Sequence, residues 1–284
     1  MACVVAAVVG ILLSNVCDTN AFQQTVNLRQ PLALSARRGR RLIHKGLDKE
    51  KQQSKPTVKP KTKHLSITVD SLKVVLVQVD DDDWWTENDM NPYGTKLWPA
   101  SLGIAQLLAS ENLAKRSVLE LGCGTGLVSL VAAKRGAHAV ATDVSPLVLS
   151  LVREGWEAAS CSSGTIKTAV FDVTSSSPLP IHSTELPPIV VASAMMYQAN
   201  LAEALAKRVS EAYRLGAWII IGDDDTGNRE GGRERFEANL QRHLQLDDVR
   251  WVHSTVKCKE LKWAQKHVEI LQLNNPSLQK GARN

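Results

Sequence analysis

Short apolar runs alternate with longer amphipathic segments from residue 67 onward, and this pattern predicts an α/β fold. Brief runs rich in Val, Ile and Leu indicate buried strands, whereas apolar residues recurring at helical spacing indicate helices. The predicted strands are 67–70, 72–79, 118–121, 139–143, 168–172, 188–193, 218–221, 249–256 and 267–273. The predicted helices are 99–110, 127–135, 146–158, 201–215 and 229–244. The first two strands are short and adjacent, which predicts a β-hairpin.

A glycine-rich turn separates one predicted strand from the helix that follows it. Gly122, Gly124 and Gly126 occupy three of its five positions. Glycine reaches positive φ without steric cost and lets a ligand approach the backbone, and the helix N-terminus behind it offers unpaired N–H groups. The next strand ends in Asp143, 21 residues after Gly122, where a carboxylate can accept both ribose hydroxyls. These features favour a nucleoside-cofactor site; an NAD site and a turn that only packs helix on sheet are the alternatives.

The spacing of the glycines departs from the dinucleotide fingerprint G-x-G-x-x-G. The run Glu120-Leu-Gly-Cys-Gly-Thr-Gly126, followed by Ala141-Thr-Asp143, resembles motif I and the ribose acid of S-adenosylmethionine-dependent methyltransferases of the seven-strand class. The resemblance implies a Rossmann-like seven-stranded sheet with helices on both faces and an antiparallel C-terminal strand pair. It implies S-adenosylmethionine as the cofactor, bound by Glu120, Gly122, Cys123, Gly124, Gly126 and Asp143.

A second run narrows the resemblance. Gly94-Thr-Lys-Leu-Trp-Pro-Ala100, before motif I, is similar to the seven-strand protein-lysine methyltransferase family, which includes bacterial members labelled as nicotinamide methylases. The likeness covers residues 67–273 and places Trp98 near the methionine end of the cofactor. It assigns Asp172 and Val173 to the adenine, although the family often has Trp where Val173 stands. It also places Ala192, near the end of strand 188–193, towards the transferred methyl.

The segment after that strand carries the largest departure from the family. The family pattern there is an acid, two residues and an aromatic; Tyr197 supplies the aromatic and is the expected catalytic residue, but Ala194 replaces the acid. The acid that recognises the substrate must then come from elsewhere, with Asp223–Asp225 and Asp80–Asp83 as candidates. Tyr197, Trp98 and one of Trp84 or Trp85 are candidates for an aromatic channel that suits a cation.

Three functions therefore compete. The resemblance favours transfer of a methyl group to a lysine side chain of a protein. A small-molecule N-methyltransferase is the second hypothesis, and a cofactor-binding interaction protein that has lost transfer is the third. The Asn/Asp-Pro-Pro-aromatic run of adenine-amino methyltransferases is missing, which argues against methylation of nucleic-acid amino groups.

The distribution of charge also argues against a nucleic-acid substrate. The chain carries a net charge of +5, but residues 1–66 hold 12 Lys and Arg against 3 Asp and Glu, and residues 67–284 hold 22 against 26. The mildly acidic catalytic region argues against a nucleic-acid groove built from bulk charge and suits a cationic substrate. The five cysteines have no metal-ligand spacing, so no metal site is expected.

The N-terminal segment has the composition of a targeting sequence. Residues 2–13 form an apolar run that is too short to span a bilayer and fits a signal h-region. We expect a signal-like segment at 1–21, a basic disordered transit or linker segment at 22–64 and the methyltransferase domain at 65–284. The arrangement resembles the bipartite plastid presequences of algae with secondary plastids, and implies no stable membrane anchor after processing. A secretory or a cytoplasmic location is the alternative.

Overall fold

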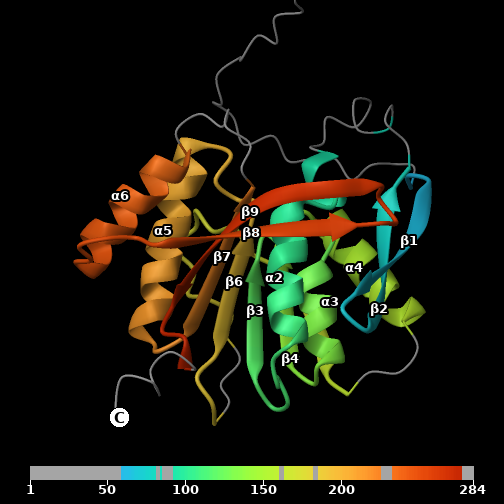
Figure 1. Cartoon of the computed structure of the whole chain (residues 1–284), viewed down its shortest axis with the longest axis horizontal. Coiled ribbons are helices and arrows are strands. Elements are labelled where there is room, and N and C mark those ends of the chain that lie inside the picture. Colours follow the sequence, from blue (N-terminus) through green and yellow to red (C-terminus); the bar gives the residue numbers. More distant parts are fainter. Residues whose placement is uncertain are drawn as a thin grey trace, which may run out of the picture. The chain divides into compact units, whose positions relative to one another are not determined.

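The computed structural model describes residues 59–80, 84, 92–159, 163–181, 185–224 and 232–276, which all belong to a compact unit spanning 54–284. Their centre is a seven-stranded sheet with the order β5-β4-β3-β6-β7-β9-β8 (Figure 1). The parallel strands are β3 (Ser117–Leu121), β4 (His138–Asp143), β5 (Thr165–Val170), β6 (Ile189–Ser193) and β7 (Trp218–Asp224). The antiparallel strands are β8 (Trp251–Cys258) and β9 (Trp263–Leu273). The predicted α/β fold and the antiparallel C-terminal pair are confirmed.

Helices cover both faces of this sheet. On one face lie α2 (Pro99–Ala109), α3 (Leu127–Lys134) and α4 (Pro146–Ala158); on the other lie α5 (Ala199–Arg214) and α6 (Gly232–Leu244) (Figure 1). The central strands β3 and β7 are buried along their whole length, because each is enclosed by helices on both sides. Parallel strands in such a fold read as continuous apolar runs, which is why the sequence located them well.

The predicted hairpin is also confirmed. Strands β1 (Thr62–Val69) and β2 (Leu72–Val79) pair antiparallel, and β1 begins three residues before the expected domain start at residue 65. The inward side chains of the hairpin join a core cluster with α2 and α3. Its close approach to α4 needs a glycine, because a Cβ on Gly155 would lie 2.6 Å from the backbone oxygen of Val75.

Several predicted strand boundaries were wrong, among them the start of β1, which lies at Thr62 rather than residue 67. Strand β5 ends at Val170 rather than residue 172, because its ladder with β4 ends where Asp143 pairs with Val170. Strand β7 continues to Asp224 instead of stopping at residue 221, since pairing with β9 holds its polar end in the sheet. For the same reason β9 is longer than expected and starts at Trp263. The pattern of apolar residues does not reveal the polar ends of strands, because backbone pairing alone sets where a strand begins and ends there.

Several expectations lie outside the described residues: those on residues 1–58, on Asp81–Asp83, on Trp85, on Cys161 and on Asp225. In the part of the chain that the structure describes, no helix is long and apolar enough to cross a membrane. The same residues contain no cluster of three or more His, Cys, Asp or Glu side chains suited to a metal.

Candidate functional site

The glycine-rich turn between β3 and α3 lies at the carboxyl edge of the sheet. Gly122, Gly124 and Gly126 have φ angles of 61°, 51° and 71°, in the left-handed region that glycine tolerates best. The Cys123 backbone N–H donates to the Thr142 carbonyl at 2.7 Å, which ties the turn to β4. The Cys123 side chain is buried, and burial raises its pKa well above the usual range. The turn therefore presents backbone rather than side chains.

Neighbouring groups lie too close to the turn for side chains at Gly122 and Gly124. A Cβ on Gly122 would lie 2.5 Å from the Met195 sulfur, and one on Gly124 would lie 3.2 Å from the Gly94 carbonyl oxygen. The short 3-10 helix η1 (Pro92–Thr95) thus lies next to the turn. The Gly94 and Trp98 run identified in the sequence and the motif I glycines therefore meet in space.

Glu120 places a carboxylate beneath this turn. Its side chain is fully buried, and Oε2 accepts hydrogen bonds from the Ser129 backbone N–H at 2.9 Å and the Ser129 hydroxyl at 2.5 Å. The other oxygen, Oε1, has no hydrogen-bond partner among the described residues. Desolvation raises the pKa of Glu120 to about 7. A buried oxygen without a donor is costly, so this oxygen could accept from a cationic or N–H donor of a ligand.

Asp143 ends β4 on the other side of the turn. Its Oδ2 accepts from the Gly124 N–H at 3.2 Å and its Oδ1 from the Ser145 N–H at 3.0 Å, while burial raises its pKa. Two apolar side chains, Val144 and Val170, stand beside it and are each 62% exposed. Sequence reasoning missed both, although an apolar residue directly after an acid at a strand end is a usable signal. The carboxylate and the apolar pair together suit a ribose next to a flat aromatic base.

The segment after β5 carries the residues assigned to the adenine. Asp172 is exposed, and its Oδ1 accepts from the Thr174 N–H at 2.8 Å and the Thr174 hydroxyl at 2.7 Å, forming a tight local turn. Val173 is buried in the core cluster beneath α5, so its side chain faces inward. Asp172 is thus on the site edge, whereas Val173 supports the wall from behind.

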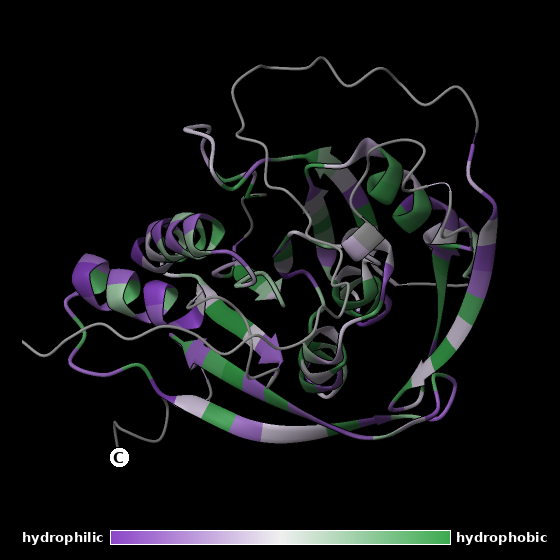
Figure 2. Cartoon of the chain, turned by 90° about the horizontal axis from the view of Figure 1, so that it is seen from above, coloured by the Kyte–Doolittle hydropathy of each residue, from purple (hydrophilic) through white to green (hydrophobic). Residues whose placement is uncertain are grey.

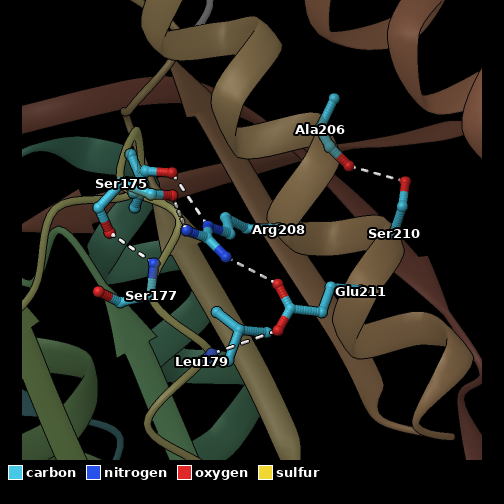
Figure 3. Close-up of polar contacts among 8 residues, drawn as sticks. Ser175, Ser177, Leu179, Ala206, Arg208, Ser210 and Glu211 are labelled. Carbon is cyan, nitrogen blue, oxygen red and sulfur yellow. Dashed lines mark hydrogen bonds and ion pairs between the residues drawn. The ribbon is translucent and has the colours of Figure 1, made fainter.

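A buried arginine on α5 holds this segment in place (Figure 3). Arg208 is 3% exposed and donates from Nε to the Val173 carbonyl at 3.0 Å and from its NH2 group to the Ser175 carbonyl. Its NH1 group pairs with Glu211 Oε2 at 2.8 Å, and Glu211 Oε1 accepts from the Leu179 N–H at 3.2 Å. We call Arg208 and Glu211 the α5 clamp. It fixes the backbone that carries Asp172.

Replacing Arg208 by Lys should destabilise the protein and weaken cofactor binding together. A single ammonium cannot reach three divergent acceptors, so buried carbonyls lose their donors at a cost of about 2–4 kcal/mol. Affinity for S-adenosylhomocysteine, read by calorimetry well below the melting temperature, should fall several-fold. Arg116→Lys is the control, because Arg116 also donates to a loop carbonyl, that of Pro187, but precedes β3 at the opposite edge. Equal cofactor affinity in both variants would contradict a positioning role for the clamp.

Aromatic rings gather on the side of the turn where η1 lies. Trp98 Nε1 donates to the Tyr93 carbonyl at 3.1 Å. The Tyr93 ring centroid lies 5.7 Å from that of Trp98 and 6.2 Å from that of Tyr197, with interplanar angles of 52° and 46°. Tyr93 and Tyr197 are 52% and 37% exposed, and partial burial raises the pKa of Tyr197. We call Tyr93, Trp98 and Tyr197 the aromatic wall; the sequence analysis did not single out Tyr93. Trp84, a candidate for the aromatic channel, is buried.

Position 194, where Ala replaces the acid of the family, has an unusual backbone conformation. Ala194 has a φ of 54°, and its N–H donates to the Gly222 carbonyl at 3.0 Å. Asp and Asn tolerate this left-handed conformation better than Ala, so an acid would be conformationally favoured here. Ala192 is buried within β6, paired with Leu121 and Ile221, and its side chain lies in the core.

Three of the proposed substitute acids, Asp80, Asp223 and Asp224, lie within the described residues. Asp223 and Asp224 are buried inside β7, and Asp224 Oδ1 accepts from the Ala100 N–H at 2.6 Å, at the start of α2. The prediction that these two lie in a loop after residue 221 was wrong, because pairing with β9 extends the strand to Asp224. Asp80 is exposed, but it pairs with Lys63 at 2.6 Å on the hairpin.

Comparisons with known proteins point to a family for this chain. A family model described as lysine methyltransferase matches residues 79–243. The protein-lysine methyltransferase METTL21E of Bos taurus is 43% identical over 63 residues, which are 21% of this chain and 22% of that protein. The electron transfer flavoprotein beta subunit lysine methyltransferase of Danio rerio is 26% identical over 181 residues, 58% of this chain and 64% of that protein.

A more distant relative and a solved structure extend the comparison. The ribosomal protein L11 methyltransferase of Pseudomonas paraeruginosa is 28% identical over 156 residues, covering 55% of this chain and 48% of that protein. The structure of the T. thermophilus 16S rRNA N2 G1207 methyltransferase in complex with AdoMet and guanosine aligns with a TM-score of 0.47 and 17% identity, over 76% of this chain and 51% of that one. The chain thus spans less than two thirds of the length of these relatives.

Proposed function

This chain belongs to the lysine methyltransferase family, and we propose that it transfers a methyl group from S-adenosylmethionine to a lysine side chain of a protein. The observation that carries the proposal is the convergence at one sheet edge of Glu120, the glycine turn, Asp143 and the aromatic wall. A small-molecule amine is the alternative acceptor. The third possibility is a cofactor-binding protein without transfer, and Ala194 is the reason to test it.

Each group of site residues is assigned to a different part of S-adenosylmethionine. The unpartnered Glu120 oxygen is matched to the α-ammonium, and the Asp143 carboxylate to the ribose hydroxyls. Val144 and Val170 offer exposed apolar surface to the adenine, with Asp172 at its edge. The backbone of the glycine turn admits the ligand closely because no Cβ intervenes. When bound, S-adenosylmethionine supplies an activated methyl group on a sulfonium.

The protein then has to present a neutral amine to that methyl. The free lysine pKa is about 10.4, so an apolar surrounding must lower it before the nitrogen has a lone pair. The aromatic wall of Tyr93, Trp98 and Tyr197 supplies such a surrounding and also attracts the cation that arrives. Since no Asp or Glu occupies position 194, that surrounding lacks one carboxylate that would favour the charged amine.

Calorimetry tests cofactor binding, which is the first step of the proposed activity. We expect the full-length protein to bind S-adenosylmethionine and S-adenosylhomocysteine, and Asp143→Ala to weaken both by about tenfold or more, since a lost hydrogen bond to a charged group costs about 1.5–3 kcal/mol. Asp248→Ala is the control, because Asp248 pairs with Arg250 on the exposed surface. Wild-type protein that binds neither compound would overturn the proposal.

A tritiated methyl donor in a cell lysate separates the three functions. Label recovered as methyl-lysine in precipitated protein supports the proposed activity. Label in acid-soluble amines supports a small-molecule acceptor, and no transfer by a protein that binds the cofactor well supports an interaction role. Ala194→Asp, measured alongside, tests whether the missing acid limits transfer.

We also propose a plastid location for the protein, on the basis of the N-terminal sequence alone. An apolar run at 2–13 precedes a basic segment that lacks acids until Asp48, apart from Asp18. Residues 1–64 fused to a fluorescent protein should enter the plastid of an alga with a secondary plastid. Secretion or a diffuse cytoplasmic signal would contradict this proposal.

A further inference from the structure

The β8–β9 ribbon extends past the sheet at the edge where the site lies. Pairing of β7 with β9 ends at Asp224 and Val268, so residues 263–267 of β9 continue beyond β7. Strand β8 accompanies them, with Thr255 opposite His267 and Cys258 opposite Trp263. Figure 1 shows the two strands running past β7 and across α2 towards β1.

This end of the ribbon is held rigidly from beneath. Val256, Cys258 and Val268 are buried in the core cluster that includes α2 and the hairpin. Gly103 of α2 approaches the ribbon so closely that a Cβ there would lie 3.0 Å from Val268. At the turn, Glu260 Oε1 accepts from the Thr68 N–H of β1 at 3.0 Å. Since α2 begins directly after Trp98, the ribbon is anchored to the helix that follows one ring of the aromatic wall.

The exposed side chains at this end of the ribbon are mostly basic, with Lys257 on the side away from the core and Lys266, opposite Val256, on the same side as Val256. Lys257, Lys259, Lys262 and Lys266 are all exposed, and Glu260 is the one acid among residues 252–267. Within the described ranges, none of the four lysines has an ion-pair partner. His253 and His267 lie among them and are hydrogen-bonded to each other at 3.1 Å. This local excess of positive charge contrasts with residues 67–284, where acids outnumber bases.

We propose that this basic ribbon end, residues 257–266, is the docking surface for an acidic segment of the protein that is methylated. The inference rests on the proposed function and adds a class of substrate to it: a target lysine accompanied in space by Asp and Glu residues. Charge complementarity supports the assignment, since exposed lysines on a ribbon that extends past the carboxyl end of β7 attract and orient an acidic partner. Lysines on an edge strand also prevent strand pairing between molecules, and β8 is the edge strand of this sheet. The test must separate these two roles.

Short fluorescein-labelled peptides provide the probe. One peptide has a lysine flanked by Asp and Glu, a second replaces these acids by Asn and Gln, and a third replaces them by Arg. Fluorescence anisotropy with the full-length protein should show tightest binding of the acidic peptide, weakening as salt rises from low to physiological ionic strength. The fourfold variant Lys257→Gln, Lys259→Gln, Lys262→Gln, Lys266→Gln should lose about tenfold in affinity for the acidic peptide.

A second fourfold variant is the matched control. Lys73, Lys115, Lys167 and Lys207 are equally exposed and lie on other elements, so changing them to Gln alters the net charge identically. This variant should bind the acidic peptide as the wild type does. Equal losses in both variants, no binding of the acidic peptide, or aggregation of the ribbon variant with unchanged affinity would each overturn the proposal.

Two further measurements complete the design. An RNA oligonucleotide that displaces the acidic peptide and binds more tightly would assign the ribbon to nucleic acid instead, and would likewise overturn the proposal. Calorimetry with S-adenosylhomocysteine on each variant keeps the two hypotheses apart. If the wild type fails to bind that compound, the proposed function fails, whereas retained cofactor binding with no peptide preference removes only the docking surface.

Discussion

Glu120→Gln should make the ligand-free protein more stable at pH 8 while it impairs cofactor binding. The folded-state pKa of Glu120 is about 7, against an ordinary value of 4.5, because the carboxyl is buried. A raised carboxyl pKa means that the folded state holds the proton more tightly than the unfolded state. Stability from this group is therefore greatest below pH 4.5 and declines as pH rises towards 7, by about 3 kcal/mol in total.

Glutamine stays neutral at every pH and avoids this loss. In urea unfolding, Glu120→Gln should be close to the wild type at pH 5 and more stable at pH 8, by up to about 3 kcal/mol. Glu157→Gln, on the exposed side of α4, should change neither value. A Glu120→Gln protein that is equally destabilised at both pH values would show that the burial of charge is not what limits stability here.

The same substitution should weaken S-adenosylhomocysteine binding by about 10- to 100-fold at pH 8, because a charged hydrogen bond contributes about 1.5–3 kcal/mol. Wild-type affinity should itself fall as pH drops below about 7 and Glu120 takes up a proton. In the variant this pH dependence should disappear. Calorimetry between pH 6 and 8 measures both effects, and a wild type with flat affinity over that range would contradict the assignment of Glu120 to the ammonium.

Gly126→Ala should be the most damaging single methyl addition in the site. Gly126 has a φ of 71°, and a Cβ there would lie 2.6 Å from Cγ2 and 2.7 Å from Cγ1 of Val152 on α4. Left-handed backbone costs a non-glycine residue about 1–2 kcal/mol, and overpacking adds about 1–3 kcal/mol. We expect a total loss of about 2–5 kcal/mol in urea unfolding, with cofactor binding lost or greatly weakened.

Gly216→Ala separates the two causes. Gly216 has a similar φ of 77°, but nothing lies within 4 Å of its Cβ position. The Gly216→Ala variant should lose only the stability that the left-handed backbone costs, about 1–2 kcal/mol in the free energy of unfolding, and should keep its affinity for S-adenosylhomocysteine. Equal losses in the two variants would mean that α4 yields to the added methyl, and that the turn is less tightly packed than the structure indicates.

The local chemistry of the cofactor turn could be predicted from sequence because it is local. Three glycines after an apolar strand, followed by an acid at the next strand end, identify a βαβ nucleoside turn whatever surrounds them. Helix α4 was predicted with its observed ends, since Pro146 begins it and Ser145 caps it. The parallel strands followed from apolar runs that are buried on both faces.

Tertiary structure decided the features that depend on distant segments. Asp223 and Asp224 read as loop acids, yet pairing with β9 places them inside a strand, and no local pattern records that pairing. The unpartnered oxygen of Glu120 and its raised pKa arise from α3 folding back over β3. Tyr93 joins Tyr197 across more than a hundred residues, and Arg208 reaches the segment after β5 from α5.

The sequence by itself therefore determined the fold class, the family and the cofactor turn, because hydrophobic period and glycine spacing act between near neighbours in the chain. Only the tertiary structure decided which acids are buried and which rings form the wall, and extended the lysine-rich end of the β8–β9 ribbon past the carboxyl end of β7. Burial and charge environment are sums over residues that meet only after folding, so they follow from sheet order and register rather than from local pattern.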